Sequence, residues 1–182
     1  GSFFLTAWLI PPTRRGEGAD LNGAQLTVDG IIASRTGGWA QLGIALIGLT
    51  MIPLVLSDVS GEPLGEVFFQ LSAWSVALEQ VADAKVWLVT AIIAAVVGVC
   101  GLLARSWFSQ VALCGGALAS IMPLALTGHS ASGGSHDFGT NSLIWHLVFM
   151  LIWVGGLMAL VAHGRRLGPN LEGCLLYTSD AA

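Results

Sequence analysis

Long uncharged stretches of apolar residues alternate with short charged segments along the chain. Asp, Glu, Lys and Arg are absent from residues 36–57, 86–104, 106–136 and 138–164. A helix needs about 20 mostly apolar residues to cross the hydrocarbon core of a membrane. Each run must cross as a helix, because lipid provides no hydrogen-bond partners for an open backbone. The pattern predicts spanning helices at about 38–57, 85–104, 107–128 and 141–163. Pro53 and Pro123 should kink or loosen two of them.

The segments outside these four runs complete the predicted architecture. The opening "FFLTAWLIPP" is typical of the last turns of a truncated spanning helix, residues 1–12, stopped by two prolines. Residues 13–36 form a polar connection, and residues 37–168 form the main transmembrane domain. The expected fold class is therefore all-α: a polytopic transmembrane helix bundle with four complete spans plus the end of a truncated one.

A different hydrophobic period appears at about 63–82, between the first two complete spans. Apolar residues recur there at intervals of three or four, at Val67, Leu71, Trp74, Leu78 and Val81. This period predicts an amphipathic helix lying at the membrane interface. Its polar face carries Glu66, Gln70 and Glu79, and an acidic face favours capping the mouth of the bundle over binding anionic lipid.

Composition supports a membrane protein. The 182 residues are 54% hydrophobic and 10% charged, whereas soluble domains carry about 25% charged residues. A basic patch is missing, so nucleic acid is not an expected partner. The three cysteines lack metal-motif spacing, and the sequence contains no H-E-x-x-H, phosphate loop or nucleophile elbow. We therefore expect no enzymatic activity.

The basic residues predict which side of the membrane each loop faces. Because successive loops alternate sides, six arginines fall on one side and only Lys85 on the other. This bias places the arginine-rich loops in the cytoplasm. The amphipathic helix and the loop near residue 130 are then extracytoplasmic. The six arginines are Arg14, Arg15, Arg35, Arg105, Arg165 and Arg166.

Three of the four histidines gather in or beside the loop between the last two spans. His129 follows the third span, His136 and Asp137 lie in the loop, and His146 lies about two turns inside the fourth span. If these two helices are antiparallel neighbours, His129 and His146 lie near the same outer face. Imidazole binds copper, zinc, iron and nickel, and an ionisable residue at membrane depth indicates function. Loop polarity alone is the competing interpretation.

Helical spacing adds further candidates on the fourth span. His146, Met150 and Trp153 share one helical face, and a thioether beside an imidazole suits Cu(I), although methionine is also an ordinary core filler. Gly155 and Gly156 are expected to let another helix approach closely. On the third span Cys114, Leu118 and Met122 share one helical face. They form either a track in which the two sulfur atoms are soft metal ligands or a row of ordinary core residues. His163 is expected to snorkel at the helix end.

The segments "PLALTGHSA" and "SLIWHLVFMLIWVGGLMAL", with the "HD" loop between them, resemble the copper resistance D (CopD) family. The similarity is greatest to actinobacterial chains that fuse a CopD-like region to a cytochrome c oxidase assembly (CtaG-like) region. The resemblance implies copper binding and transport or resistance, with His129, His146 and Trp153 at family-like positions. The resemblance also implies a location in the bacterial inner (plasma) membrane and a bound copper ion, as Cu(I) or Cu(II). The partners that it implies, besides the lipid bilayer, are a periplasmic copper chaperone or oxidase assembly factors.

Two other functions compete with copper handling: a haem-b redox module with two histidine ligands, and a structural scaffold without metal. The haem alternative is weaker because only His129 and His146 are candidate ligands. The final "CLLYTSDAA", residues 174–182, resembles a translated sequencing adapter and is excluded from these predictions.

Overall fold

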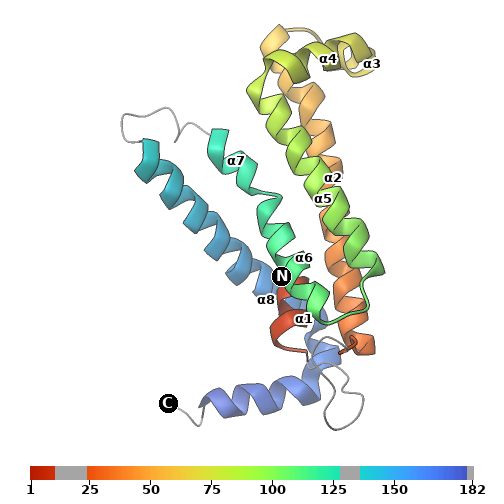
Figure 1. The fold of residues 1–182 in the computed structure, drawn as a ribbon, viewed down its shortest axis with the longest axis vertical. Helices are drawn as coiled ribbons and strands as arrows, with labels where there is room; N and C mark the ends of the chain where they lie inside the picture. Colours follow the sequence, from red (N-terminus) through yellow and green to blue (C-terminus); the bar gives the residue numbers. More distant parts are fainter. Residues whose placement is uncertain (11–23, 128–135, 180–182) are drawn as a thin grey trace.

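A computed structural model describes the backbone of residues 1–10, 24–127 and 136–179, and the helices there account for all regular elements of this part of the chain. Four helical stretches are long and apolar enough to cross a membrane, and the third of them, Phe108–Ala125, runs across two of the helices named below. This confirms the predicted all-α bundle. Figure 1 shows a hairpin of two long helices beside a second group of helices. The helices are α1 Ser2–Trp8, α2 Val28–Ser60, α3 Leu64–Phe69, α4 Leu71–Gln80, α5 Ala82–Leu103, α6 Phe108–Ala119, α7 Met122–Thr127 and α8 His136–Ser179.

The first complete span begins earlier than predicted, and residues 28–36 of the expected polar connection belong to α2. Thr27 caps this helix, because its side-chain oxygen accepts a hydrogen bond from the Gly30 amide at 3.2 Å. Asp29 adds a favourable negative charge in the first turn. With 33 residues, α2 is about 50 Å long, which exceeds the hydrocarbon core of about 30 Å. The helix therefore extends beyond the bilayer.

Small residues bring α2 and α5 into close contact along the hairpin in Figure 1. A Cβ atom built on Gly38 would lie 2.8 Å from the Gly98 carbonyl oxygen, and one built on Gly98 would lie 2.8 Å from Leu42 Cγ. The buried Ser34 hydroxyl donates a hydrogen bond to the Gly101 carbonyl at 2.9 Å. In lipid, helix association relies on such close packing and interhelical hydrogen bonds. These contacts make the hairpin the framework of the bundle.

We expect Gly38→Ala to destabilise the protein by about 1–3 kcal/mol, because the new methyl group meets backbone of α5 and overpacks the interface. Gly43→Ala is the matched control on the same helix, since a Cβ there meets no atom within 4 Å. Alanine favours helix over glycine, so the control should be neutral or stabilising. Thermal unfolding in detergent measures both variants. Equal melting temperatures for the two variants would contradict this packing.

The predicted amphipathic helix at 63–82 is divided at Gln70 into α3 and α4. The chain first turns at Gly61, whose φ of 73° is left-handed and favours glycine. Val67 is then buried against Ile52, Leu56 and Ala84. The division lets Trp74 join this cluster while its ring nitrogen donates to the Val67 carbonyl at 3.2 Å. The apolar stripe therefore packs onto the end of the α2–α5 hairpin.

The third predicted span is interrupted: α6 ends at Ala119 and α7 begins at Met122. Pro123 explains the interruption, because proline has no N–H to donate to the Ala119 carbonyl. Short α1 packs against α2, α6 and α8. Leu5 of α1 is fully buried in a cluster with Ala33 of α2 and Ala159 of α8. This short helix therefore joins the two groups of helices seen in Figure 1.

Candidate metal centre

The end of α7 at Thr127 and the start of α8 at His136 lie on the same side of the bundle as α3 and α4 (Figure 1). Helix α5 runs from that side to the opposite side, where it ends at Leu103. Helices α6 and α7 then run back, so α7 ends on the side where α5 began (Figure 1). Helix α8 starts at this end and contacts α7. His129 itself lies outside the described residues. The segment between Thr127 and His136 therefore joins two neighbouring helix ends, as expected for antiparallel spans.

His136 and Asp137 are the first two residues of α8, whereas the sequence interpretation placed them in the loop. The correction has a physical reason, since the first turn of a helix favours a carboxylate through the helix dipole. Their backbone is described, and their side chains lie outside the description. The two residues follow the segment that carries His129. The histidine-rich segment, residues 129–137, therefore ends in the first turn of α8.

His146 lies deeper along α8 than predicted, because the helix begins at 136 rather than at about 141. Ten residues of helix separate His136 from His146, a rise of about 15 Å. Metal–nitrogen bonds of about 2 Å leave this span too long for both imidazoles to hold one ion. The predicted ligands whose backbone is described therefore divide into two groups, His136 with Asp137 and His146 with Met150.

The second group lies on the exposed face of α8. His146 is exposed, Met150 is 41% exposed, and Trp153 is 72% exposed. Trp145 and Phe149 stack on the same side of the helix, with their ring centroids 5.8 Å apart. His146 therefore does not face α7. Within the described part of the chain, no three His, Cys, Asp or Glu residues come together as a metal-binding group.

The two glycines of the "WVGGL" segment differ in their surroundings. Gly155 lies against Gly1, and a Cβ built on Gly155 would lie 3.2 Å from the Gly1 nitrogen. A Cβ on Gly156 would meet no atom within 4 Å, and Trp153 is largely exposed. Of the three residues proposed for helix packing, Gly155 is the one in close contact with another helix in this structure. Gly156 and Trp153 remain on the accessible side of α8.

The prediction that His163 snorkels to the surface is wrong, because this residue is only 7% exposed. Helix α1 packs against α8, and Ala159, one turn before His163, lies in the cluster with Leu5. The sequence gives no signal for this burial. It depends on a tertiary contact between the first and last helices.

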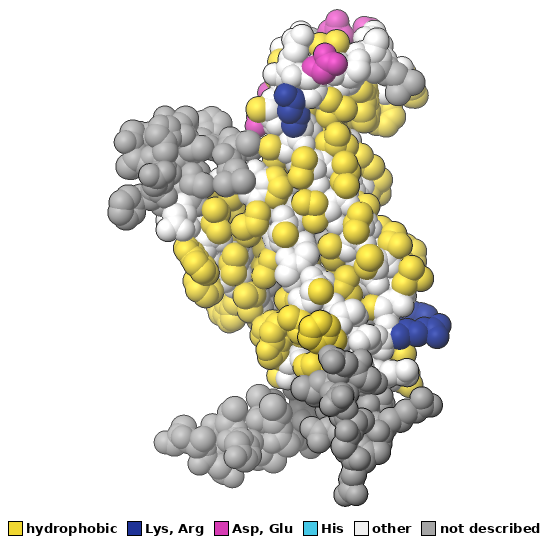
Figure 2. All heavy atoms as spheres, in the orientation of Figure 1, with side chains coloured by type: hydrophobic (Ala, Val, Ile, Leu, Met, Phe, Trp, Pro, Cys, Tyr) yellow, Lys and Arg dark blue, Asp and Glu magenta, His cyan; other side chains and the backbone are white. Residues whose placement is uncertain are grey.

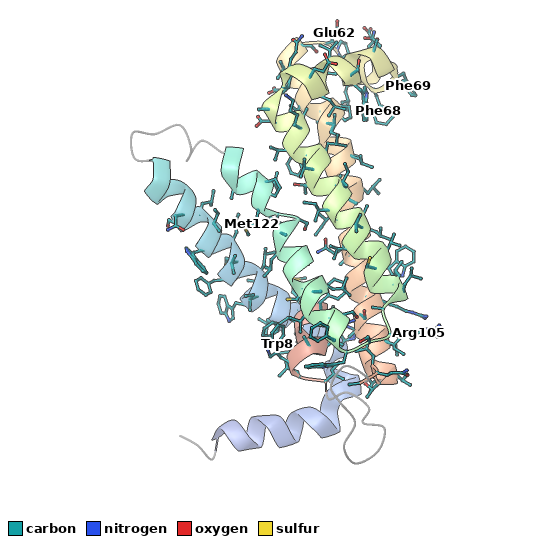
Figure 3. The ribbon with its side chains drawn as sticks, in the orientation of Figure 1. Trp8, Glu62, Phe68, Phe69, Arg105 and Met122 are labelled. Atoms are coloured by element: carbon teal, nitrogen blue, oxygen red, sulfur yellow. The ribbon has the colours of Figure 1, made fainter. Side chains whose placement is uncertain are left out.

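Charge is divided between the two ends of the hairpin. Figure 2 shows acidic side chains, with a basic one beside them, around α3 and α4, and basic side chains near the opposite end. Figure 3 labels Glu62, Phe68 and Phe69 at the first end and Trp8 and Arg105 at the second. The second end is held by backbone hydrogen bonds from Leu26 to Arg105 at 2.9 Å and from Trp107 to Ala24 at 3.0 Å. The acidic end is on the side of the bundle where α7 ends and α8 begins.

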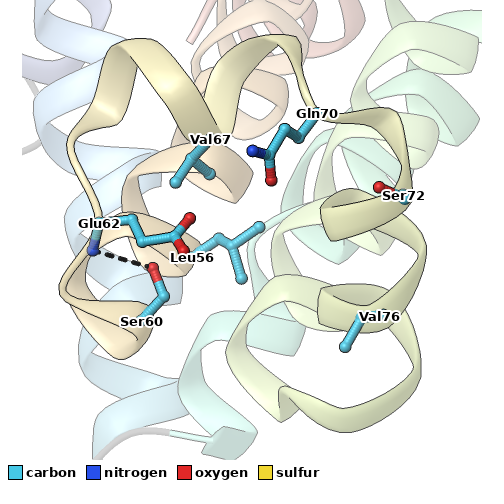
Figure 4. Close-up of a pocket in the computed structure, with 7 residues that line it drawn as sticks. All are labelled: Leu56, Ser60, Glu62, Val67, Gln70, Ser72 and Val76. Atoms are coloured by element: carbon cyan, nitrogen blue, oxygen red, sulfur yellow. Dashed lines mark hydrogen bonds between the residues drawn. The ribbon is translucent and has the colours of Figure 1, made fainter.

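A cup of about 320 Å³ opens among the ends of α2, α3 and α4. Figure 4 shows apolar side chains and the Glu62 carboxylate around it. The Glu62 backbone is fixed by two hydrogen bonds, one from its amide to Ser60 at 3.2 Å and one from Ser57 to its carbonyl at 2.7 Å. A single carboxylate can attract a cation but does not by itself form a metal site. The lining residues are Leu56, Ser60, Glu62, Val67, Gln70, Ser72 and Val76.

Several polar side chains of the described residues are buried in the bundle, and apart from His163 the sequence analysis did not select them. The most central pair is Gln41 of α2 and Ser120 at the end of α6, with Ser120 Oγ 3.5 Å from Gln41 Oε1. The available signal was a polar residue within an otherwise apolar window. The buried polar and charged residues are Thr6, Ser34, Gln41, Thr90, Gln110, Ser120 and His163.

Comparison with known proteins gives one match. The family model for the copper resistance protein D-like, N-terminal domain matches residues 1–140. This range includes His129, His136 and Asp137, and it ends before His146 and Met150. No curated protein and no solved structure matches the chain.

Proposed function

The chain belongs to the copper resistance protein D-like family, and we propose that this membrane protein captures copper with its histidine-rich segment and passes it on. The observation that carries the proposal is the position of that segment. It connects the adjoining ends of α7 and α8 within the range that the family model matches. Imidazole and carboxylate together suit a copper ion.

The capture site consists of His129, His136 and Asp137. His129 follows the end of α7 by two residues, and the other two begin α8. The three residues therefore lie in, or directly after, the short connection between neighbouring helices. The acidic residues around α3 and α4 share this end and raise the local concentration of cations.

His146 and Met150 form a second position, from which copper passes to a partner. They lie one turn apart on α8, a rise of about 6 Å, and both are exposed. A copper ion bound there is accessible from outside the chain. An oxidase assembly factor or a copper chaperone is the class of partner that this position would supply.

The haem alternative is disfavoured by the position of His146. A haem clamped between α7 and α8 needs an imidazole that faces α7, whereas His146 lies on the exposed face. An absorption spectrum of the purified protein tests this point. A Soret band that disappears on His146→Ala would contradict copper handling as the function.

We propose that the histidine segment faces the outside of the cell and that the end with Arg35 and Arg105 faces the cytoplasm, following the positive-inside rule. In a variant without native cysteines, Ser60→Cys should react with a membrane-impermeant maleimide on intact spheroplasts. Gln25→Cys is the matched control and should react only after permeabilisation. The reverse pattern would overturn this orientation.

Copper capture should weaken in mild acid, because a protonated imidazole has no lone pair for the metal. With two histidines in the capture site, we expect affinity to fall at least about tenfold between about pH 7.5 and about pH 5.5. Equilibrium titration of copper into the purified protein, against a competing chelator, measures the change. An affinity that is constant over this range would exclude histidine ligands.

A further inference from the structure

A pocket of about 300 Å³ lies at the end of the hairpin where α2 begins and α5 ends. Arg35 of α2 and Arg105, which follows α5, both line it, and Leu102 and Leu103 form part of its apolar wall. Figure 2 shows the basic side chains at this end beside the apolar surface of the hairpin. The volume is at the lower end of the range for ligand pockets, so it suits the headgroup of a lipid and not a whole lipid.

Hydrogen bonds hold the two sides of this pocket together. The Leu26 amide donates to the Arg105 carbonyl at 2.9 Å, which fixes the segment after α5 against the segment before α2. Next to Arg35, the Ser34 hydroxyl donates to the Gly101 carbonyl at 2.9 Å and joins the two helices. The backbones that carry the two arginines are therefore fixed relative to each other. A ligand between them binds at a small cost in ordering of the chain.

The positive charge of these two arginines is not balanced by a carboxylate of the described residues. Asp29, in the first turn of α2, precedes Arg35 by six positions, which places it on another face of the helix. The other acidic side chains that the structure describes lie at the opposite end of the hairpin. Two guanidinium groups that share one pocket repel each other, so an anion between them is stabilised by both.

The pocket lies at the depth of the lipid phosphates. Lys85 and Arg105 bracket an uncharged run of the sequence that is about 30 Å long as a helix, which matches the thickness of the hydrocarbon core. Trp39, one turn after Arg35, is 66% exposed, and tryptophan is enriched at the boundary between hydrocarbon and headgroups. Leu103 is 73% exposed and extends the apolar wall of the pocket to the outer surface of the hairpin.

We propose that this pocket binds one anionic phospholipid, with its phosphate between Arg35 and Arg105 and an acyl chain along Leu103. The inference goes beyond copper handling and does not depend on it. Guanidinium groups form paired, charge-assisted hydrogen bonds with phosphate oxygens, and basic pockets between spanning helices bind anionic headgroups. A zwitterionic lipid binds more weakly because its own ammonium group already compensates the phosphate. The bound lipid links the start of α2 to the end of α5.

Native mass spectrometry of the full-length chain, released from detergent, tests the site. Phosphatidylglycerol is the probe, and phosphatidylcholine with the same acyl chains is the zwitterionic comparison. We expect one phosphatidylglycerol per chain to bind at least about tenfold more tightly than phosphatidylcholine. Arg35→Gln/Arg105→Gln should remove this preference. Lys85→Gln is the control at the other end of α5, and it should leave the affinity for phosphatidylglycerol within about twofold.

Melting temperatures of the same samples show that the variants are folded and give a second measure of binding. Phosphatidylglycerol should raise the melting temperature of the unaltered protein and of Lys85→Gln, because a ligand of the folded state stabilises it. It should not raise that of Arg35→Gln/Arg105→Gln. If this variant does not fold, Arg35→Lys/Arg105→Lys keeps both charges and loses the planar forks. Its affinity for phosphatidylglycerol should be at least about threefold weaker than that of the unaltered protein.

Three results would overturn the inference: equal affinity for the two lipids, unchanged affinity in the folded arginine variant, or an equal loss in Lys85→Gln. Inorganic phosphate tests the other source of the same chemical group. Sodium chloride at the same ionic strength is the control for screening. If inorganic phosphate displaces phosphatidylglycerol and sodium chloride does not, the pocket binds the free ion, and the assignment to a lipid is wrong.

Discussion

His129→Ala/His136→Ala should abolish high-affinity copper capture. Loss of a group that only supports a metal ligand costs about 10–100-fold in affinity, so removing two direct ligands should cost at least about 100-fold. Asp137 remains in this variant, and a single carboxylate is a poor copper site. Competition with a chelator of known affinity measures the change in the dissociation constant.

His163→Ala provides the matched histidine control for this experiment. His163 is buried and lies on the part of α8 remote from the helix start. Its replacement removes an imidazole without changing the capture site, so copper affinity should stay within about twofold. A comparable loss in His163→Ala and in the double variant would show that copper binding reports the integrity of the fold rather than the histidine segment.

His146→Ala/Met150→Leu should separate capture from transfer. The two residues lie too far from His136 along α8 to share its ion, so the capture affinity should be unchanged. Copper delivery should fall at least about tenfold, because the exposed position that a partner reaches is lost. Copper tolerance and the copper content of the terminal oxidase, in cells that depend on the variant, measure delivery.

Phe149→Leu is the control for the second variant, since Phe149 is 63% exposed on the same face and has no metal ligand. It should leave delivery unchanged. Loss of capture in His146→Ala/Met150→Leu would place His146 in the same site as His129. Normal capture and normal delivery would leave this face of α8 as an ordinary lipid contact.

The number and the approximate place of the spans could be predicted because charge is excluded from the hydrocarbon core. The early start of α2 could not be predicted from that rule. Arg35 lies within the helix, and a helix longer than the bilayer is thick can carry charge where it projects. The usable signal was local, namely Thr27 followed three residues later by Gly30, whose amide it caps.

The divisions of helices have different degrees of predictability. Pro123 signalled a weakness in the third span, and α6 indeed ends at Ala119. Pro53 carried the same signal, yet α2 continues through it. The division at Gln70 has no sequence signal, because it arises from the need to bury Val67 and Trp74 together on the end of the hairpin.

The candidate site was predictable in its residue types and less so in its geometry. The clustering of histidines is visible in the sequence, but the separation of His136 from His146 appears only once α8 is seen to begin at 136. The buried Gln41 side chain contacts Ser120, a residue far away in the chain. Periodicity along one segment contains no information about such a pair.

We propose that this protein binds copper at the end of the bundle where α7 meets α8. The most direct measurement is the copper-to-protein ratio of the purified, copper-loaded protein beside His129→Ala/His136→Ala, with an absorption spectrum of the same samples. We predict that the unaltered protein holds about one copper ion per chain more than the variant, and that neither sample shows a Soret band. Equal copper in both samples, or a haem band lost with the histidines, would contradict copper binding by these histidines.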